Sequence, residues 1–120
     1  MMKRSELLPE IFFDESLDST NLELFQNQYL RAILKYQHDY LMLLVKDSCK
    51  QMNPNLLNLM EKERKQFIRQ MIQNNQVLRN QCIGLIIGFL ELEQLAWYLK
   101  HKTECNKRIL QMVEKRVLGS

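Results

Sequence analysis

The sequence contains few of the residues that interrupt or cross-link a chain. It has three glycines and two prolines among 120 residues, whereas all-β folds need many more turn signals than these can supply. Leu, Gln, Lys, Glu, Met and Arg are frequent, and all of them are good helix formers. A chain of this length can bury a single core in one domain. We therefore predict an all-α fold.

Disulfides and membrane spans are also disfavoured. The three cysteines, Cys49, Cys82 and Cys105, are an odd number without CxxC spacing, which argues for free, buried thiols in a reducing compartment. The most apolar stretch, CIGLIIGFL at residues 82–90, is much shorter than the roughly 20 residues that span a bilayer. Pro9 lies where a signal peptide would need an apolar core. We expect a cytoplasmic protein that does not associate with membranes.

The net charge of +3 is unevenly distributed. Residues 1–20 carry two basic and five acidic groups, whereas residues 95–120 carry six basic and two acidic groups. The six basic residues are Lys100, Lys102, Lys107, Arg108, Lys115 and Arg116. Such a segment attracts phosphate groups or acidic surfaces. We expect these charges to be mainly solvated, so that nucleic-acid binding is at most weak, and Trp97 and Tyr98 beside them to lie in the core.

The spacing of apolar residues predicts a long first helix from near Thr20 to about Gln51, which Asn53-Pro54 then ends. Its apolar positions repeat at intervals of three and four: Leu22, Phe25, Tyr29, Ile33, Tyr36, Tyr40 and Leu44. Further apolar residues widen this arc on one side: Leu30, Leu34, Leu41 and Val45. The polar face opposite contains Gln28, Arg31, Lys35, His38 and Asp39.

A second long helix is predicted from a capping pattern at Asn58 to Gly88. Gly88 could adopt a left-handed C-terminal cap, and Gly84 could allow another helix to approach closely. Shorter helices are predicted over about residues 91–101 and from Thr103 to the C-terminus. Together these segments predict a bundle of four helices, two long and two short, over residues 20–120, preceded by a partly ordered arm over residues 1–19.

Four polar residues interrupt the apolar faces of the two long helices. At about 100° per residue, Gln26 and Gln37 project from the apolar arc of the first helix, as Asn75 and Arg79 do on the second. A buried polar side chain costs free energy unless it is hydrogen-bonded, so we expect the four to meet in one polar layer. The layer either fixes helix register or a subunit interface, or it lines a pocket for a small polar or anionic ligand anchored by Arg79.

Residue patterns typical of catalysis are weak in this chain. Its two histidines lack the Glu-x-x-His spacing of di-metal helical bundles, and His101-x-x-x-Cys105 would supply only one edge of a metal site. A glycine-rich phosphate loop is also missing. We assign no catalytic residue, no metal site and no cofactor.

Four segments resemble a family of small helical bacterial proteins of about this length: FQNQYLRAILKYQ at 25–37, VLRNQ at 77–81, IIG at 86–88 and NKR at 106–108. The resemblance covers roughly residues 20–118 and includes Gln26, Gln37 and Arg79. Members are sometimes labelled glyoxalase, but the family implies no established activity. Glyoxalase I enzymes have a mixed α/β fold with His and Glu metal ligands, which this sequence does not support.

The sequence therefore predicts a non-enzymatic protein-interaction or regulatory module. One alternative is a ligand binder or lyase-type enzyme that uses the Gln26, Gln37, Asn75 and Arg79 layer, and another is weak nucleic-acid binding by the basic C-terminal segment. We expect a homodimer, because the apolar arc of the first helix is wider than one antiparallel partner would cover.

Overall fold

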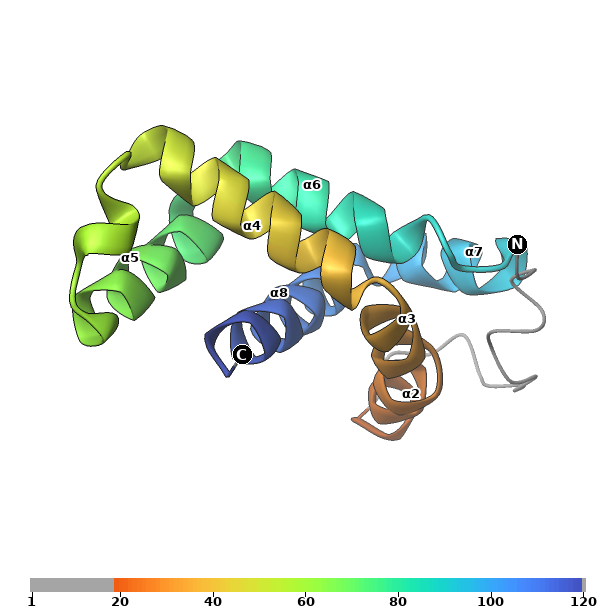
Figure 1. Cartoon of the computed structure of the whole chain (residues 1–120). Coiled ribbons are helices and arrows are strands. Elements are labelled where there is room, and N and C mark those ends of the chain that lie inside the picture. The colour runs from red at the N-terminus through yellow and green to blue at the C-terminus, as the bar shows by residue number, and fades with distance from the viewer. Residues whose placement is uncertain (1–18, 120) are drawn as a thin grey trace.

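The computed structural model describes residues 19–119, and this part of the chain is all-α, without strands (Figure 1). The helices are α2 (Ser19–Phe25), α3 (Arg31–Tyr36), α4 (His38–Met52), α5 (Glu61–Asn74), α6 (Gln76–Ile87), α7 (Leu92–Lys100) and α8 (Lys102–Leu118). A π-helical turn, Gln26–Leu30, joins α2 and α3 into one continuous helix, and a 3-10 turn, Leu56–Asn58, lies between α4 and α5. Counting α2–α3 as one, these are six helices. The prediction of four helices was wrong because both predicted long helices are broken. Residues 1–18 of the predicted arm lie outside the described part of the chain.

The first long helix breaks at Gln37. Its backbone leaves the helical region (φ −93°, ψ 11°), and α3 and α4 point in clearly different directions (Figure 1). The Gln37 side chain is only 6% exposed, and its Nε2 donates a hydrogen bond to the Leu85 carbonyl of α6 at 3.1 Å. A contact between residues 48 positions apart therefore accompanies the bend, which local spacing could not predict.

The second long helix breaks at Asn75, whose backbone is extended (φ −84°, ψ 106°). Its side-chain Oδ1 accepts a hydrogen bond from the Leu78 amide at 3.0 Å, which makes Asn75 the N-cap of α6. The predicted cap at Asn58 was also wrong, since α5 begins at Glu61 after Met60. One polar residue expected inside a helix is thus the start of a new one.

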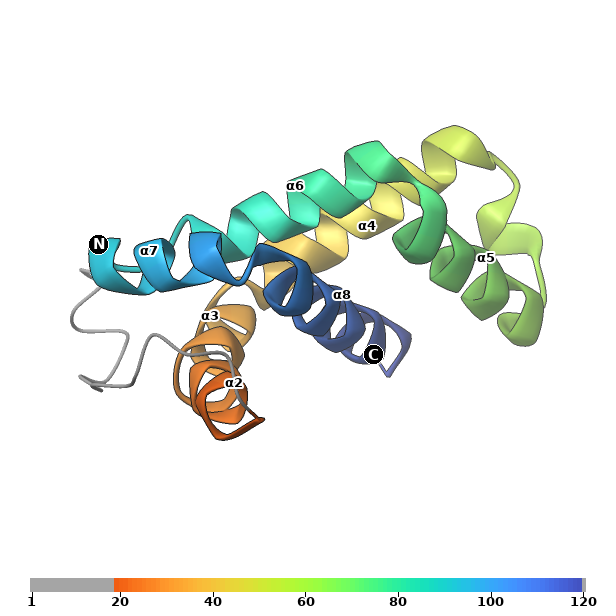
Figure 2. The same cartoon turned by 180° about the vertical axis from the view of Figure 1, so that it is seen from behind.

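The helices form two layers. Helices α4 and α6 lie side by side and antiparallel, while α5, α8 and the α2–α3 helix lie beneath them (Figures 1 and 2). Helix α8 contacts α4, α5 and α6, so it is the central element of the lower layer. Arg108 of α8 contacts Gln26 of the α2–α3 helix through its side chain.

The core confirms much of the predicted inward pattern. Phe25, Tyr29 and Ile33 of the first helix are fully buried. Trp97 and Tyr98 are buried too, with the Trp97 ring 4.7 Å from that of Phe25. These aromatic residues belong to the core, as the helical spacing predicted.

The predicted roles of two glycines were wrong. Gly84 is exposed on α6, and a Cβ added there would meet nothing within 4 Å. Gly88 follows α6 with φ −62°, in the right-handed region. Gly84 therefore allows no close helix approach within the described chain, and the end of α6 does not depend on a left-handed residue.

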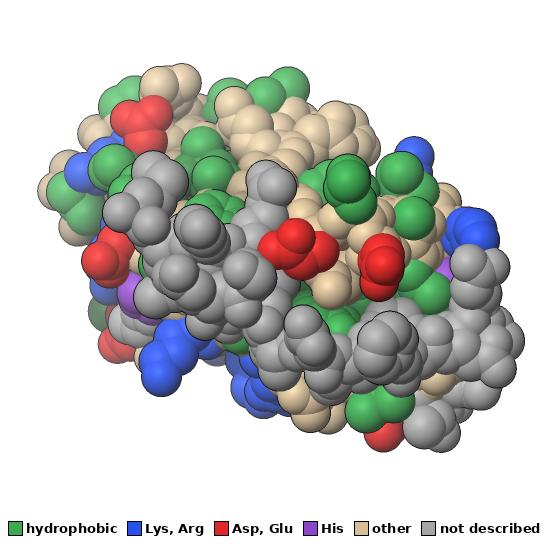
Figure 3. All heavy atoms as spheres, turned by 90° about the vertical axis from the view of Figure 1, so that its right-hand side faces the viewer, with side chains coloured by type: hydrophobic (Ala, Val, Ile, Leu, Met, Phe, Trp, Pro, Cys, Tyr) green, Lys and Arg blue, Asp and Glu red, His purple; other side chains and the backbone are tan. Residues whose placement is uncertain are grey.

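Most of the wide apolar arc is covered within one chain. Tyr36 and Tyr40 of the arc remain 39% and 64% exposed, and Leu43, which was not part of the predicted arc, is 71% exposed. At the α7 end, hydrophobic side chains on the visible surface lie in separate patches (Figure 3). The homodimer remains a prediction, now resting on these three exposed side chains.

The three thiols are buried and free, as predicted. Burial raises the pKa of Cys49 and of Cys82 to about 11, and that of Cys105 to about 12. Such thiols form little nucleophilic thiolate near neutral pH. Within residues 19–119, every helix is too short or too polar to cross a membrane.

Candidate functional site

The four residues of the predicted polar layer do not form one cluster in the structure. Gln37 instead completes the C-terminal end of α6. At this end the Phe89 backbone amide donates to the Ile86 carbonyl. In a regular α-helix the same amide would donate to the Leu85 carbonyl, so Leu85 lacks its usual backbone donor. The Gln37 amide group donates to that carbonyl, which satisfies one of the acceptors left at a helix C-terminus.

Asn75 and Arg79 act at the junction between α5 and α6. Asn75 caps the N-terminus of α6, as described above. Arg79 is partly buried and reaches back, its Nη1 donating to the Gln73 carbonyl at 2.6 Å and to the Ile72 carbonyl at 3.5 Å. Both are carbonyls of the last turn of α5, where a cation also interacts favourably with the helix dipole.

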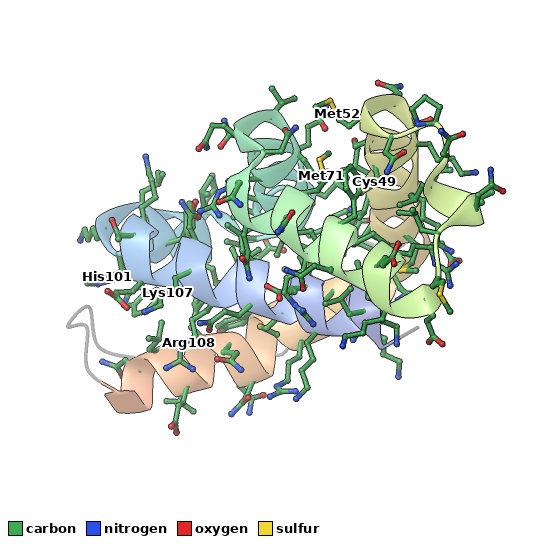
Figure 4. All side chains as sticks on the ribbon, turned by 90° about the vertical axis from the view of Figure 1, so that its left-hand side faces the viewer. Cys49, Met52, Met71, His101, Lys107 and Arg108 are labelled. Atoms are coloured by element: carbon green, nitrogen blue, oxygen red, sulfur yellow. The ribbon has the colours of Figure 1, made fainter. Side chains whose placement is uncertain are left out.

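Gln26 has a different environment. Its Oε1 accepts a hydrogen bond of 2.7 Å from Nη1 of Arg108 on α8. Three of the four predicted residues therefore satisfy helix ends, and the fourth faces α8. Figure 4 shows Arg108 between α8 and the α2–α3 helix.

The Gln26–Arg108 contact lies in a groove of about 560 Å³ between the α2–α3 helix, the start of α4, and α8. We call it the basic groove. The residues that line it are Gln26, Arg31, Leu34, His38, Arg108, Gln111, Met112, Lys115, Arg116 and Gly119. Four of these lining residues are charged, and all four are basic: Arg31, Arg108, Lys115 and Arg116. The volume is within the range typical of small-molecule sites.

The π-helical turn determines which side chains enter the groove. In an α-helix, residues five apart differ by about 140° around the axis at 100° per residue. Here the Arg31 amide bonds to the Gln26 carbonyl, the five-residue closure of a π turn. Arg31 consequently lies roughly one turn above Gln26, and both line the groove. Such single π turns occur frequently at functional sites.

Neutral acceptors orient the groove arginines. Arg108 donates to the Gln26 amide oxygen. Arg31 donates from Nε to the Asn27 Oδ1 at 2.8 Å. An amide oxygen fixes the direction of a guanidinium group but leaves its positive charge uncompensated.

Arg116 forms a second contact across the groove. Its Nη1 lies 3.3 Å from Nδ1 of His38. This contact joins the start of α4 to the last turn of α8 on the groove wall.

The opposite flank of α8 has different electrostatics. There Glu114 receives a hydrogen bond and ion pair from Nε of Arg69 on α5 at 3.1 Å, and Gln73 donates to the same carboxylate at 3.4 Å. Cation and carboxylate compensate each other on this side. The cations of the basic groove are therefore a local feature and not a general property of α8.

The six basic residues noted in the sequence separate in space. Arg108, Lys115 and Arg116 line the basic groove, whereas Lys107 lines a smaller hollow beside Arg79. Lys100 and Lys102 are exposed on either side of the α7–α8 turn. Half of the predicted basic set thus contributes to one site.

Sequence reasoning missed Arg31 and His38 as site residues. Both were placed on the polar face of a regular first helix and outside the predicted polar layer. The π turn rotates Arg31 towards α8, and the bend at Gln37 places His38 at the groove edge. Neither irregularity leaves a recognisable signal in the sequence.

Among the described residues, no group of three or more His, Cys, Asp or Glu side chains is arranged to hold a metal ion. Comparison with known proteins found no matching protein-family model, curated protein or solved structure. The resemblance to small bacterial helical proteins therefore remains a prediction.

Proposed function

We propose that this protein is a non-enzymatic binding module that holds an anionic ligand in the basic groove. The observation that carries the proposal is the set of four cationic residues in one hollow, two of them held by neutral amide oxygens. A carboxylate or phosphate group entering the groove would replace water around these cations and form charge-assisted hydrogen bonds. The module would act through ligand-dependent interactions rather than chemistry.

The chemistry of the groove supports binding over catalysis. The described lining residues offer guanidinium, ammonium, amide, imidazole and apolar groups, and none of them carries a hydroxyl or thiol nucleophile. His38 is engaged with Arg116. The three thiols lie in the core with raised pKa values. This supports a ligand-binding role rather than the lyase-type alternative.

The same lining favours a compact anion over nucleic acid. Proteins that hold single strands combine a basic groove with aromatic rings on which bases stack. The described residues of the basic groove contain no Phe, Tyr or Trp, and the nearby Trp97 and Tyr98 are buried. Nucleic acid would therefore be limited to salt-sensitive phosphate contacts.

The proposal can be tested by titrating the full chain with inorganic pyrophosphate and measuring the affinity by calorimetry. We expect Arg108→Gln to weaken binding about tenfold or more, because it removes one charge-assisted hydrogen-bond donor worth about 1.5–3 kcal/mol. Arg69→Gln is the matched control, since it removes an arginine of α5 that pairs with Glu114 on the opposite flank of α8. Equal affinities for the three proteins, or no binding to the unmodified chain, would contradict the proposal.

A single-stranded oligonucleotide titrated in parallel tests the competing function. We expect weak binding that disappears at physiological salt, because only phosphate contacts contribute. Tight binding that persists at this salt concentration would favour a nucleic-acid role instead.

A further inference from the structure

A further hollow, of about 480 Å³, lies between α4, the 3-10 turn, α5 and the C-terminal end of α8. We call it the amphipathic hollow. Helix α5, which forms one of its walls, lies at the end of the molecule opposite α7 (Figure 1). The residues that line it are Met42, Lys46, Lys50, Leu56, Leu57, Glu61, Arg64, Lys65, Ile68, Val117 and Leu118. This set combines apolar and basic side chains, and the volume is within the range typical of small-molecule sites.

Three cations of the amphipathic hollow are uncompensated. The one carboxylate of the described lining, Glu61, already forms an ion pair with Lys65 at 3.2 Å. In the described part of the chain, the side chains of Lys46, Lys50 and Arg64 form no hydrogen bond or ion pair. Lys46 and Lys50 are four residues apart and therefore neighbours on one side of α4, while Arg64 belongs to α5. Positive charge thus comes from two walls of the hollow.

Part of the apolar lining is accessible to a ligand. Leu57 of the 3-10 turn is 68% exposed, and Met42 and Leu118 are partly exposed. The other three apolar lining residues are buried and belong to the core below. An apolar group that covered Leu57 would remove its side chain from water, which the hydrophobic effect favours.

We infer that the amphipathic hollow binds a single-chain anionic amphiphile, in particular a linear fatty acid. The carboxylate head binds the three uncompensated cations in charge-assisted hydrogen bonds. The alkyl tail covers the exposed apolar surface at Leu57 and its partly exposed neighbours in the lining. A compact anion would leave this apolar surface in water, and an uncharged lipid would leave the cations without a counter-charge. The site is separate from the basic groove, so the inference does not depend on the proposed function.

A series of linear alkanoates from butanoate to dodecanoate tests the inference. Each is titrated into the full chain below its critical micelle concentration, and the affinity is measured by calorimetry. We expect the affinity to increase by up to about fourfold for each added methylene, because each one buries further apolar surface. The increase should stop once the tail is longer than the hollow. The matched uncharged alkanols, up to octanol, should bind more weakly than the acids. Equal affinities for acid and alcohol, or no binding of any alkanoate, would overturn the inference.

Variants of exposed side chains test the head and the tail separately. Lys46→Gln and Lys50→Gln should each weaken decanoate binding about two- to fivefold, the range expected for exposed charges. Lys62→Gln, an exposed lysine of α5 outside the lining, is the control. Leu57→Gln should reduce the gain per methylene while leaving butanoate affinity unchanged, and Met60→Gln, at a side chain 75% exposed and outside the lining, should do neither. Circular dichroism verifies that each variant keeps its helices. Variants that bind like their controls would contradict the inference.

Arg108→Gln separates this site from the basic groove. It should leave decanoate affinity unchanged, because Arg108 does not line the amphipathic hollow. If decanoate binding instead falls with Arg108→Gln and not with Lys50→Gln, the acid binds in the basic groove and the inference is wrong. If pyrophosphate does not bind but the alkanoates follow the expected pattern, the proposed function fails and the inference stands. Sedimentation with anionic phospholipid vesicles, by a chain that binds no monomeric alkanoate, would overturn the inference in favour of a membrane surface.

Discussion

The helix junctions and the basic groove use similar polar residues for opposite purposes. At the junctions, Gln37 and Arg79 donate to backbone carbonyls that their helices leave open. In the groove, Gln26 accepts from the Arg108 side chain. At the junctions the partner of the side chain is a backbone carbonyl, whereas in the groove it is the partly exposed guanidinium group of Arg108.

This difference indicates which polar residues support folding and which support binding. Removing a side chain that donates to an otherwise open backbone carbonyl leaves that acceptor unsatisfied. A side chain that orients an accessible cation contributes little to stability, because water can replace it. A polar residue on the apolar face of a predicted helix can therefore have either role, and only its hydrogen-bond partner in the structure tells which.

The largest effect on stability should come from Gln37→Met. Methionine keeps the volume of the side chain but removes the amide that donates to Leu85, so the carbonyl loses this donor at a partly buried position. We expect a loss of about 1–3 kcal/mol in the free energy of unfolding, measured by urea denaturation. Gln81→Met, on the exposed face of α6, is the control. An unchanged midpoint for Gln37→Met would show that this junction contact is not needed.

A smaller loss is expected for Arg79→Ala. The side chain is only partly buried, so water can replace part of what it donates to the last turn of α5. We expect the free energy of unfolding to fall by about 1 kcal/mol, with no change in pyrophosphate affinity. A loss as large as that of Gln37→Met would indicate a sealed polar core, and weaker anion binding would place Arg79 in the site.

The smallest effect on stability should come from Gln26→Met. Because the groove is open to solvent, we expect the free energy of unfolding to change by no more than about 0.5 kcal/mol. Affinity for pyrophosphate should nevertheless fall by a few-fold, since Arg108 loses the acceptor that directs it. Calorimetry and urea denaturation on the same protein separate the two quantities. Destabilisation without an effect on binding would assign Gln26 to the junction class.

The order of these effects could not be obtained from the sequence. A helical wheel gave Gln26, Gln37, Asn75 and Arg79 equivalent positions, because it assumes an unbroken helix at about 100° per residue. The breaks at Gln37 and Asn75 remove that assumption. In retrospect, polar residues on the apolar faces marked helix ends more often than they marked a pocket.

The sequence by itself determined the features that depend on local spacing. Few turn residues and intervals of three and four gave the all-α fold, the buried face of Phe25, Tyr29 and Ile33, and the burial of the three thiols. These features follow because side chains on one face of a helix recur at a fixed period, and the hydrophobic effect favours burial of the apolar face. They need no knowledge of distant partners.

Only the tertiary structure decided where the helices break and where the groove forms. The bend at Gln37 is accompanied by a bond to Leu85, and the groove depends on Gln26 meeting Arg108, which is 82 residues away. The π turn that brings Arg31 beside Gln26 departs from the regular helical period. Such departures from the regular helix weaken local hydrogen bonds, and long-range contacts offset that loss. The local sequence pattern therefore does not predict where they occur.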